Sequence, residues 1–317
     1  MQAVLALLSD NEFHSGEELG EALGVTRAAV WKKLKKLESI GVTVHSVKGR
    51  GYRLPSPVEL LSPARLRGLG VPESVALDLS FETPSTNTEA KKYIDQGKPL
   101  PVLVSVERQT HGKGRRGRQW ESGVAKNLTL SFAWRFDNGP SVVEGLSLAV
   151  GVAIARVLKR MGIPNPGLKW PNDVQIDGQK VCGILLEMVA DQDVCHVIIG
   201  IGLNVEMDDA LMAHVDQPWT DLLSRLPTRP SRNEILADIT NELIEVCQLF
   251  EEGRGMKHFQ HHWQAYDVLF NQPVTVSTLS QQRQGIARGI DDNGALLLEA
   301  EGELVALHGG EISVRRG

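Results

Sequence analysis

Residues 112–118 place three glycines and four cations in seven consecutive positions, Gly-Lys-Gly-Arg-Arg-Gly-Arg, shortly after the apolar run 101–106. Glycine lets a backbone approach a ligand closely, and clustered guanidinium groups repel one another unless an anion lies among them. The segment is therefore predicted to form a loop that cradles a phosphate or a carboxylate. A solvated charged turn is the alternative, but such a turn has no need of glycines.

The same glycines satisfy the G-x-G-x-x-G pattern of dinucleotide-binding folds. That pattern binds a pyrophosphate only where a helix begins at the glycines. Here a turn-like segment, 119–123, follows instead, and residues 127–134 then alternate apolar and polar side chains as a strand does. A dinucleotide-binding fold is therefore not predicted.

The composition predicts a globular protein of two or three domains, because the chain has 317 residues and an apolar fraction of 42%. No apolar run approaches the roughly 18 residues that span a bilayer, and the N-terminus lacks a basic leader. We therefore expect a cytoplasmic protein without a membrane partner. Cys182, Cys195 and Cys247 lack C-x-x-C spacing and stand in apolar contexts, so we expect buried free thiols.

Positive charge is concentrated near the N-terminus. Residues 26–53 contain eight Lys or Arg and one acid, whereas the whole chain has a formal net charge of −5. A capping box at residues 15–18 predicts a short helix that ends before Gly24, and Thr26 can cap a second, basic helix over 27–40. Two helices joined by a glycine turn, the second of them basic, predict a helix-turn-helix.

Residues 42–54 predict a β-hairpin with a basic tip at 48–51, which would be the wing of a winged module. Phosphates would meet the wing and the lysines, while side chains near the start of the second helix would reach base edges. The predicted DNA-binding residues are Thr26, Arg27, Ala28, Trp31, Lys32, Lys35, Lys48 and Arg50. A basic helix on a protein-binding domain is the alternative, and the order of the elements disfavours it.

The positions of prolines and the strand patterns predict that the chain is divided into three parts. Pro55-Ser-Pro57 predicts a hinge, so the DNA-binding module is expected to cover residues 1–57. Residues 58–268 mix strands with helices, including an expected helix over 141–161, and form a domain of catalytic size. Residues 269–317 have short alternating strands that predict a small antiparallel β-barrel. The expected fold class is therefore α+β.

Two polar clusters lie in the first half of the central domain. The first is Ser85-Thr86-Asn87, which is suited to hold a small polar group and could also cap a helix that starts at Thr88. The second is the loop at 112–118, with Gln109 just before it.

Two more clusters follow. Leu168-Lys-Trp-Pro-Asn-Asp173 leads through a turn to Lys180-Val-Cys-Gly183, and Lys180 must either reach solvent or neutralise an anion, because an unpaired buried lysine is costly. The last cluster is Gly200-Ile-Gly-Leu-Asn204, whose small residues leave room for a planar ring, although glycines also end many strands.

Taken in order, the clusters resemble the motifs of the biotin protein ligases. That family shows S-T-N, G-R-G-R-x-G-R-x-W, K-W-P-N-D, a lysine and glycine pair, and G-x-G-x-N, and all five occur here in that order. With the winged module in front, essentially the whole chain resembles the bifunctional bacterial form, a biotin ligase joined to a repressor of the biotin operon. The resemblance implies a mixed α/β ligase domain similar to the class II synthetases.

The resemblance implies a biotin–[biotin carboxyl carrier protein] ligase. The biotin carboxylate first attacks the α-phosphate of ATP, with Mg²⁺ present, and gives biotinyl-5′-AMP and pyrophosphate. A lysine of the biotin carboxyl carrier protein of acetyl-CoA carboxylase then takes the biotinyl group and AMP leaves. Because the first step joins two anions, it requires cations. The resemblance further implies that biotinyl-5′-AMP is a corepressor that promotes a homodimer on operator DNA.

The resemblance also assigns residues. Lys180, Arg115 and Arg118 would be catalytic. The biotin-binding residues would be Ser85, Thr86, Asn87, Gln109, Lys113, Gly114, Arg115, Lys180 and Gly183. The adenylate would be bound by Arg118, Trp120, Asn172, Asn204 and Trp219, with help from Arg315, and no metal ligand is assigned. Trp219 would close over the adenine and exclude water from the reactive anhydride.

The sequence departs from the family pattern at two places. Lys113 stands where arginine is common. Residues 121–126 lack the usual proline after the serine and the usual glycine before Asn127, which bears on how this loop becomes ordered and helps to form a dimer. Two alternatives stay open: a ligase whose basic module binds no specific operator, and a ligand-sensing regulator with an inactive ligase-like domain. Intact Lys180, Arg115 and Arg118 argue against the second.

Overall fold

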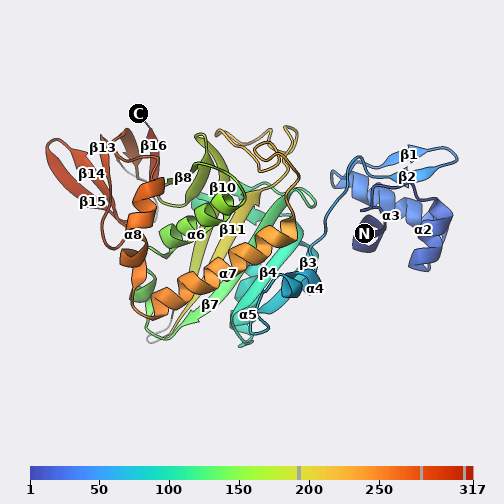
Figure 1. Cartoon of the computed structure of the whole chain (residues 1–317), viewed down its shortest axis with the longest axis horizontal. Coiled ribbons are helices and arrows are strands. Elements are labelled where there is room, and N and C mark those ends of the chain that lie inside the picture. The colour runs from blue at the N-terminus through green and yellow to red at the C-terminus, as the bar shows by residue number, and fades with distance from the viewer. Residues whose placement is uncertain (191–193, 279–280, 310–311, 317) are drawn as a thin grey trace.

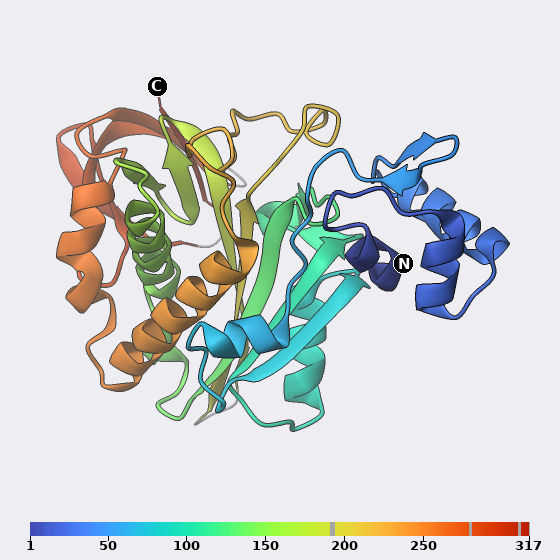
Figure 2. The same cartoon turned by 45° about the vertical axis from the view of Figure 1, so that its right-hand side comes forward.

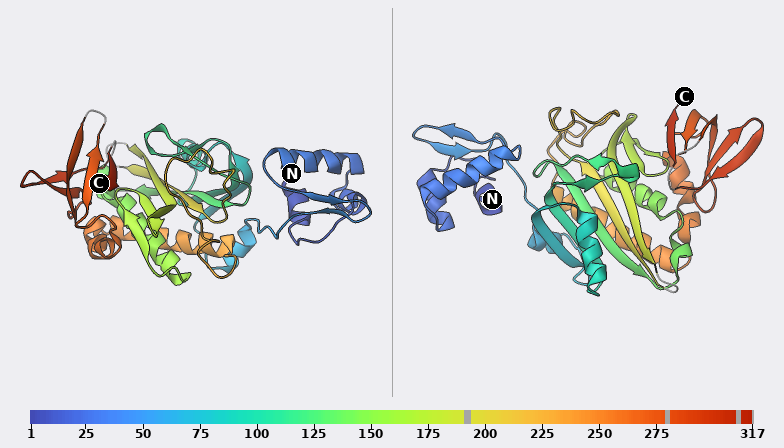
Figure 3. Two further views of the ribbon diagram at one scale, coloured as in Figure 1. Left: turned by 90° about the horizontal axis from the view of Figure 1, so that it is seen from above. Right: turned by 180° about the vertical axis from the view of Figure 1, so that it is seen from behind.

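The chain folds into three parts that follow one another along the sequence (Figure 1). The computed structural model describes residues 1–190, 194–278, 281–309 and 312–316. A small N-terminal module stands at one end, a seven-stranded sheet with its helices occupies the centre, and a five-stranded sheet lies at the other end. Figure 3 shows the same order from above and from behind. The α+β fold class is confirmed.

The N-terminal module is a helix-turn-helix with a hairpin wing, as predicted. Its elements are α1 (Gln2–Leu7), α2 (Gly16–Leu23), α3 (Arg27–Ser39), β1 (His45–Val47) and β2 (Gly51–Arg53). Ser15 and Glu18 form the capping box, Gly24 ends α2 in the left-handed conformation, and Thr26 caps α3. The short helix α1 was not predicted.

The second helix of the motif, α3, has one buried and one exposed face. Val30, Leu34 and Leu37 are buried in the core of the module. Trp31 keeps 51% of its surface exposed. The eight predicted DNA-binding residues are all exposed: Thr26, Arg27, Ala28, Trp31, Lys32, Lys35, Lys48 and Arg50. A polyanion can therefore reach each of them.

The linker after the module runs without helix or strand to about residue 62 and is fixed at its far end. The Glu59 carboxylate accepts hydrogen bonds from the Ser231 hydroxyl at 2.9 Å and from the Arg232 amide at 2.5 Å, at the start of α7 (Arg232–Glu251). Ser62 N–H also donates to Asn233 Oδ1 at 2.9 Å. A hinge was predicted at the prolines at 55 and 57, and both of them lie before this fixed point.

The central sheet has the strand order β3-β4-β7-β11-β10-β9-β8. Its strands are β3 (Ala76–Thr83), β4 (Val102–Gln109), β7 (Asn127–Phe136), β8 (Pro166–Lys169), β9 (Asp173–Ile176), β10 (Gln179–Ala190) and β11 (Cys195–Asn204). Only β3 and β4 are parallel within this sheet. The strand predicted over 127–134 is confirmed as part of β7.

Helices cover both faces of the central sheet. On one face lie α6 (Leu146–Arg160), α7 and α8 (Gly255–Tyr266), where they share a core with Leu128, Leu130 and Phe132 (Figure 2). The other face carries α5 (Thr86–Asp95), whose Ala90 packs on Val102 and Val104. A short helix, α4 (Pro63–Gly68), contacts α7.

The helix expected over 141–161 is interrupted. A 3₁₀ turn, η2 (Pro140–Val143), ends before Gly145, which has a φ of 74°, and α6 begins only at Leu146. Within the described residues, this turn and α6 together form the one helical stretch long and apolar enough to cross a membrane, and 67% of that window is buried. It is a core helix.

The C-terminal part is an open sheet, so the predicted closed barrel is wrong. Its strands are β12 (Pro273–Ser277), β13 (Gln282–Ile290), β14 (Leu296–Ala300), β15 (Glu303–Leu307) and β16 (Ser313–Arg316), in the order β15-β14-β13-β12-β16. Among the described residues, β15 and β16 are edge strands that do not pair. Val276, Leu298 and Val314 join the core of the central domain, so the apolar face is covered without closure.

The three cysteines are buried free thiols, as expected. Burial raises the pKa of Cys182 and of Cys247. A buried thiol with a raised pKa is unreactive at neutral pH. The cysteines therefore contribute packing rather than chemistry.

Candidate functional site

Two adjoining cavities lie over β10 and β11, beside the loop at 112–120. The smaller, about 60 Å³, is lined by all nine residues predicted to bind biotin: Ser85, Thr86, Asn87, Gln109, Lys113, Gly114, Arg115, Lys180 and Gly183. The larger measures about 420 Å³. Both cavities are lined by Gly114, Arg115, Trp120, Asn172 and Lys180. A ligand could therefore extend from one cavity into the other.

The Ser-Thr-Asn cluster begins α5 rather than preceding it. The helix was expected to start at Thr88 but starts at Thr86, and Ser85 occupies the N-cap position without a capping hydrogen bond from its side chain. Thr86 donates through its amide and its hydroxyl to Gln109 Oε1, at 2.8 and 3.1 Å. The polar side chains thus line the cavity wall instead of closing the helix end.

Two residues that the sequence reasoning missed form hydrogen bonds with the residues of this wall. The Ser131 hydroxyl on β7 lies 2.8 Å from the Thr86 hydroxyl and 2.5 Å from Asn87 Oδ1. Asn87 Nδ2–H donates to the Glu187 carboxylate on β10 at 2.8 Å. The signal for Ser131 was the alternation of β7, which places it on the face opposite the apolar residues. Glu187 has no signal of that kind in the sequence.

The glycine and arginine loop is a small hairpin. Strand β5 (Gly112–Lys113) pairs with β6 (Gln119–Trp120), and a 3₁₀ turn, η1 (Arg115–Gly117), forms the tip. A Cβ on Gly112 would lie 2.5 Å from the Trp120 carbonyl oxygen, so the close pairing requires glycine. No α-helix begins at the loop, which agrees with the rejection of a dinucleotide fold.

The Trp120 indole lies against the glycines of β10 and β11. A Cβ on Gly202 would come within 2.3 Å of the ring, and a Cβ on Gly183 within 3.1 Å. The cluster at 200–204 was expected to leave room for a planar ring, and at Gly202 that space is filled by the indole of Trp120. The Trp120 Nε1–H is buried and has no partner among the described residues. Trp120 therefore stands where the two cavities meet.

Lys180 is largely buried and pairs with a carboxylate. Its Nζ lies 2.6 Å from Asp173 Oδ1, and 5.8 Å from the centre of the Trp120 ring. Its backbone is held on both sides: its N–H donates to the Pro218 carbonyl and its carbonyl accepts from Thr220 N–H, each at 2.9 Å. The ammonium group is thus fixed at the junction of the cavities.

Of three other residues predicted to bind the adenylate, one lines the cavities and two do not. Asn172 accepts a hydrogen bond from Arg115 Nη1 at 3.0 Å and faces both cavities. The amide of Asn204 is occupied by Asn127 and by the Thr220 carbonyl, at 3.3 and 3.1 Å, and Asn204 lines neither cavity. Trp219 also lines neither, although its neighbours 216–218 line the larger cavity.

The larger cavity is strongly cationic. Its basic lining residues are Arg115, Arg116, Arg118, Lys169, Lys180 and Arg315, and its acidic ones are Asp173 and Asp216. Arg315 comes from the C-terminal sheet, so this sheet forms one wall. Lys169 had no predicted role. Burial lowers its pKa, and Lys180, Arg315 and Arg118 lower it further against the opposing effect of Asp173. Such a site attracts a polyanion.

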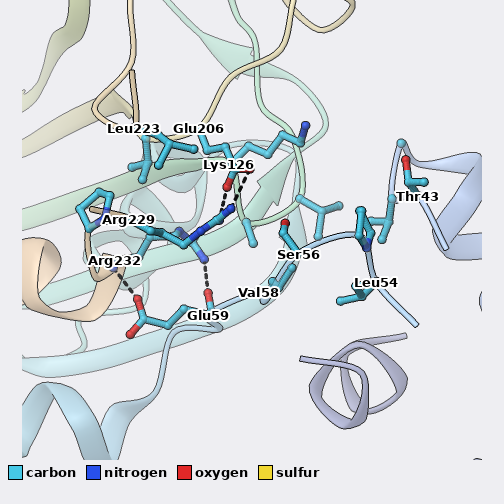
Figure 4. Close-up of a pocket in the computed structure, with 17 residues that line it drawn as sticks. Thr43, Leu54, Ser56, Val58, Glu59, Lys126, Glu206, Leu223, Arg229 and Arg232 are labelled. Atoms are coloured by element: carbon cyan, nitrogen blue, oxygen red, sulfur yellow. Dashed lines mark hydrogen bonds and ion pairs between the residues drawn. The ribbon is translucent and has the colours of Figure 1, made fainter. Parts of the chain in front are cut away.

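A separate cavity of about 130 Å³ lies between the N-terminal module and the central domain (Figure 4). Its walls are the linker, residues 41–43 of the module, residues 124–126, and the segment that leads into α7. None of the predicted site residues lines it. It is therefore distinct from the two cavities around Lys180.

Three family profiles match the chain. The Biotin/lipoate A/B protein ligase family matches residues 80–204, an HTH domain matches residues 1–53, and the Biotin protein ligase C terminal domain matches residues 269–315. The first match contains the motif residues from Ser85 to Asn204, including both strands that carry the glycines.

Similar proteins extend over nearly the whole chain. The bifunctional ligase/repressor BirA of Escherichia coli (strain K12) is 38% identical, over 98% of this chain and 96% of that protein. BirA of Bacillus subtilis (strain 168) is 31% identical, over 96% and 94%. The biotin protein ligase from Aquifex aeolicus in complex with biotin and ATP matches with a TM-score of 0.65 and 26% identity, over 76% of this chain and 99% of that one. The chain belongs to the biotin protein ligase family, in the group of bifunctional ligase/repressors.

Proposed function

We propose that the protein is an ATP-dependent ligase that forms biotinyl-5′-AMP and transfers biotin to a lysine of the biotin carboxyl carrier protein of acetyl-CoA carboxylase. We further propose that it represses the biotin operon. The observation that carries the ligase assignment is the junction of a small polar cavity with a large cationic one at Lys180. Both substrates are anionic at the reacting atoms, and this junction is where they would meet.

In the first step, the polar cavity would hold the biotin ring through Ser85, Thr86, Asn87 and Gln109. The loop backbone at 113–115 would line the valerate arm, so the carboxylate would reach Lys180. Arg115 and Arg118 would bind the phosphates of ATP in the larger cavity. Fixed cations that meet developing negative charge lower the barrier without reorganisation. Lys180 would neutralise the oxygens of the carboxylate and of the α-phosphate as they approach.

Mg²⁺ fits this site as a companion of the phosphates. It usually keeps several waters and takes one or two carboxylates together with substrate oxygens. Asp173 and Asp216 are the carboxylates that line the larger cavity, and no group of three or more metal-ligating side chains exists among the described residues. When bound, the ion would supply positive charge to the phosphates.

In the second step, a carrier lysine would attack the acyl carbon of biotinyl-5′-AMP and AMP would leave. Lys180 would again neutralise charge on the acyl phosphate. Water must be excluded because a mixed anhydride hydrolyses. The backbone of 218–220 is bound to Lys180 on both sides, so closure of this segment would bring Trp219 over the adenine. We propose that the ligase works in the cytoplasm, where ATP is supplied.

We assign residues 1–57 to DNA binding, 58–268 to catalysis, and 269–317 to a C-terminal part that adds Arg315 to the ATP cavity. As a corepressor, biotinyl-5′-AMP would promote a homodimer in which two winged modules grip a two-fold symmetric operator. The unmodified carrier protein would compete for the same adenylate. Ligand and DNA binding would then be linked by one shared equilibrium.

A direct contact supports such a link. The loop after Trp120 contains Val124, which is 8% exposed and packs in the same apolar cluster as Leu54 of the N-terminal module. The loop is tied to the ligand site as well, because the Ser122 hydroxyl accepts from Gln109 N–H at 3.1 Å. Residues 121–126 depart from the family pattern, and here they contact both parts of the chain.

Val124→Ala is expected to weaken the coupling while leaving catalysis intact. It removes two buried methyl groups, each worth about 0.8 kcal/mol, from the contact between loop and module. The gain in DNA affinity on adding biotin and ATP should fall by roughly tenfold, and the ligation rate should stay within about twofold. Fluorescence anisotropy with labelled duplex measures the first, and labelled-biotin transfer the second. An unchanged gain would exclude Val124 from the coupling.

Lys169→Met is expected to raise stability and reduce ATP affinity. Methionine keeps the volume but removes a buried charge that faces other cations, so the apparent Tm should rise or stay equal. The KM for ATP should increase by about tenfold or more, since charged hydrogen bonds contribute about 1.5–3 kcal/mol. Differential scanning fluorimetry and initial rates measure the two effects. A lower Tm with normal KM would show that Lys169 is structural.

Labelled biotin tests the ligase assignment. The protein should transfer it to the lysine of a carrier domain in the presence of ATP and Mg²⁺. Failure to label the carrier, with the ligand still bound, would establish a regulator with an inactive ligase domain.

Gel shifts at several salt concentrations test the repressor assignment. Binding with sequence preference should strengthen when biotin and ATP are added. Binding that shows no sequence preference at any salt concentration would leave a ligase with a non-specific basic module.

A further inference from the structure

Two arginines of the wing lie over the ring of Phe13. The Arg50 guanidinium carbon is 4.2 Å from the ring centre, and that of Arg53 is 4.8 Å away. Arg50 is exposed at the hairpin tip, whereas Arg53 is half-buried on β2. Cations that stand over an aromatic face at these distances are attracted by the ring quadrupole. The two contacts hold both side chains to one ring.

Phe13 itself is fixed to the wing by its backbone. The next residue, His14, exchanges two hydrogen bonds with Tyr52 on β2: its N–H donates at 3.0 Å and its carbonyl accepts at 2.8 Å. A Cβ on Gly51 would lie 2.1 Å from the His14 carbonyl, so glycine is required for this approach. His14 therefore forms an isolated antiparallel bridge with the wing, which fixes the backbone next to Phe13 to β2.

The Phe13 ring can hold the Arg50 side chain in place without neutralising its positive charge. None of the ion pairs among the described residues involves Arg50 or Arg53 with a carboxylate. A carboxylate would hold an arginine equally well but would cancel its charge toward another anion. The ring orders the long side chain, whose free rotamers cost about 2 kcal/mol to fix, and leaves the full positive charge. Arg50 is thus ordered and still cationic at an exposed position.

We propose that Phe13 is a positioning residue for DNA binding: it presents Arg50 to a backbone phosphate beside the bases that α3 contacts, while Arg53 contacts the same ring. The inference rests on the proposed repressor function and deepens it. Because a phosphate contact carries no sequence information, its loss weakens binding to all duplexes alike.

A double-mutant cycle tests the proposal. The full chain, with biotin and ATP, is titrated against a duplex that the wild type selects from a random library, and against an unrelated duplex of equal length. Arg50→Gln should weaken binding to both about tenfold and reduce the slope of log affinity against log salt by about 1. Phe13→Leu should weaken both about fivefold. The double variant should bind no more weakly than Arg50→Gln alone.

Two controls separate positioning from folding. Phe13→Tyr keeps the ring and should bind as the wild type does. Thermal unfolding and carrier biotinylation should be unchanged in all variants, and Arg50→Gln sits at an exposed tip where it cannot disturb the core. Additive losses in the double variant, or wild-type binding by Phe13→Leu, would overturn the inference alone. A wild-type chain that binds neither duplex would overturn the proposed repressor function and this inference with it.

Discussion

Lys180→Ala is expected to slow biotinyl-adenylate formation by at least about a hundredfold, the cost of removing one fixed group that stabilises transition-state charge. The ammonium group stands at the junction of the two cavities and is held there by Asp173 at 2.6 Å and by backbone hydrogen bonds on both sides. Pyrophosphate release under saturating biotin and ATP measures the effect.

The fold should survive the substitution Lys180→Ala. A second variant controls for the effect of leaving a carboxylate without its partner. Alanine leaves Asp173 without its partner, so Lys180→Ala combined with Asp173→Asn restores the local charge balance. That double variant should recover any stability that Lys180→Ala loses, which separates a loss of catalysis in Lys180→Ala from a folding defect. Lys159→Ala removes an exposed lysine at the end of α6 and serves as the matched control. Turnover close to normal in Lys180→Ala would remove Lys180 from the mechanism.

Arg232→Met should destabilise the central domain by about 3–5 kcal/mol, the usual cost of removing one partner from a buried ion pair. The pair is Arg232 with Glu107, whose side chains are 4% and 1% exposed and lie 2.6 Å apart. Arg232 also donates to the Glu59 and Asn127 carbonyls, at 2.8 and 3.0 Å. It thus joins the linker, the sheet and the end of the ligand-site loop. Figure 4 shows Arg232 beside Glu59 of the linker.

Urea unfolding followed by central-domain tryptophan fluorescence measures this loss. The double variant Glu107→Gln with Arg232→Met should recover part of it, because no uncompensated charge then remains buried. Lys91→Met breaks the exposed pair with Asp95 and should cost less than about 1 kcal/mol. If Arg232→Met lowers the free energy of unfolding as little as Lys91→Met does, the buried pair does not hold these segments together.

Local signals in the sequence were sufficient to predict the helix-turn-helix. The capping box at Ser15, the left-handed Gly24 and the Thr26 cap define a helix-turn-helix without any tertiary information, and they are all present. The motif residues of the central domain also came together, because most of them lie at or near the ends of elements that the sheet brings to one place. Nine residues from five chain segments line one small cavity.

Features that depend on tertiary packing were not predictable. Ser131 and Glu187 reach the polar wall only because α5 packs on the sheet, where Asn87 bonds to both, and the pKa of Lys169 is lowered first by burial and then by cations that are brought to it by the fold. Asn204 matches a motif, yet its amide is used by Asn127 and Thr220. The open C-terminal sheet likewise follows from the domain that covers it, which strand patterns do not reveal.

Biotin-dependent pyrophosphate release, assayed with biotin, lipoate and octanoate side by side, tests the central claim most directly. All three acids carry a carboxylate, so each could react at Lys180 if charge alone decided. The polar wall formed by Thr86, Asn87 and Gln109 has partners for the ring of biotin and none for an alkyl chain. We expect release with biotin and at most a trace with the other two. Equal release with octanoate, or none with biotin, would contradict the assignment.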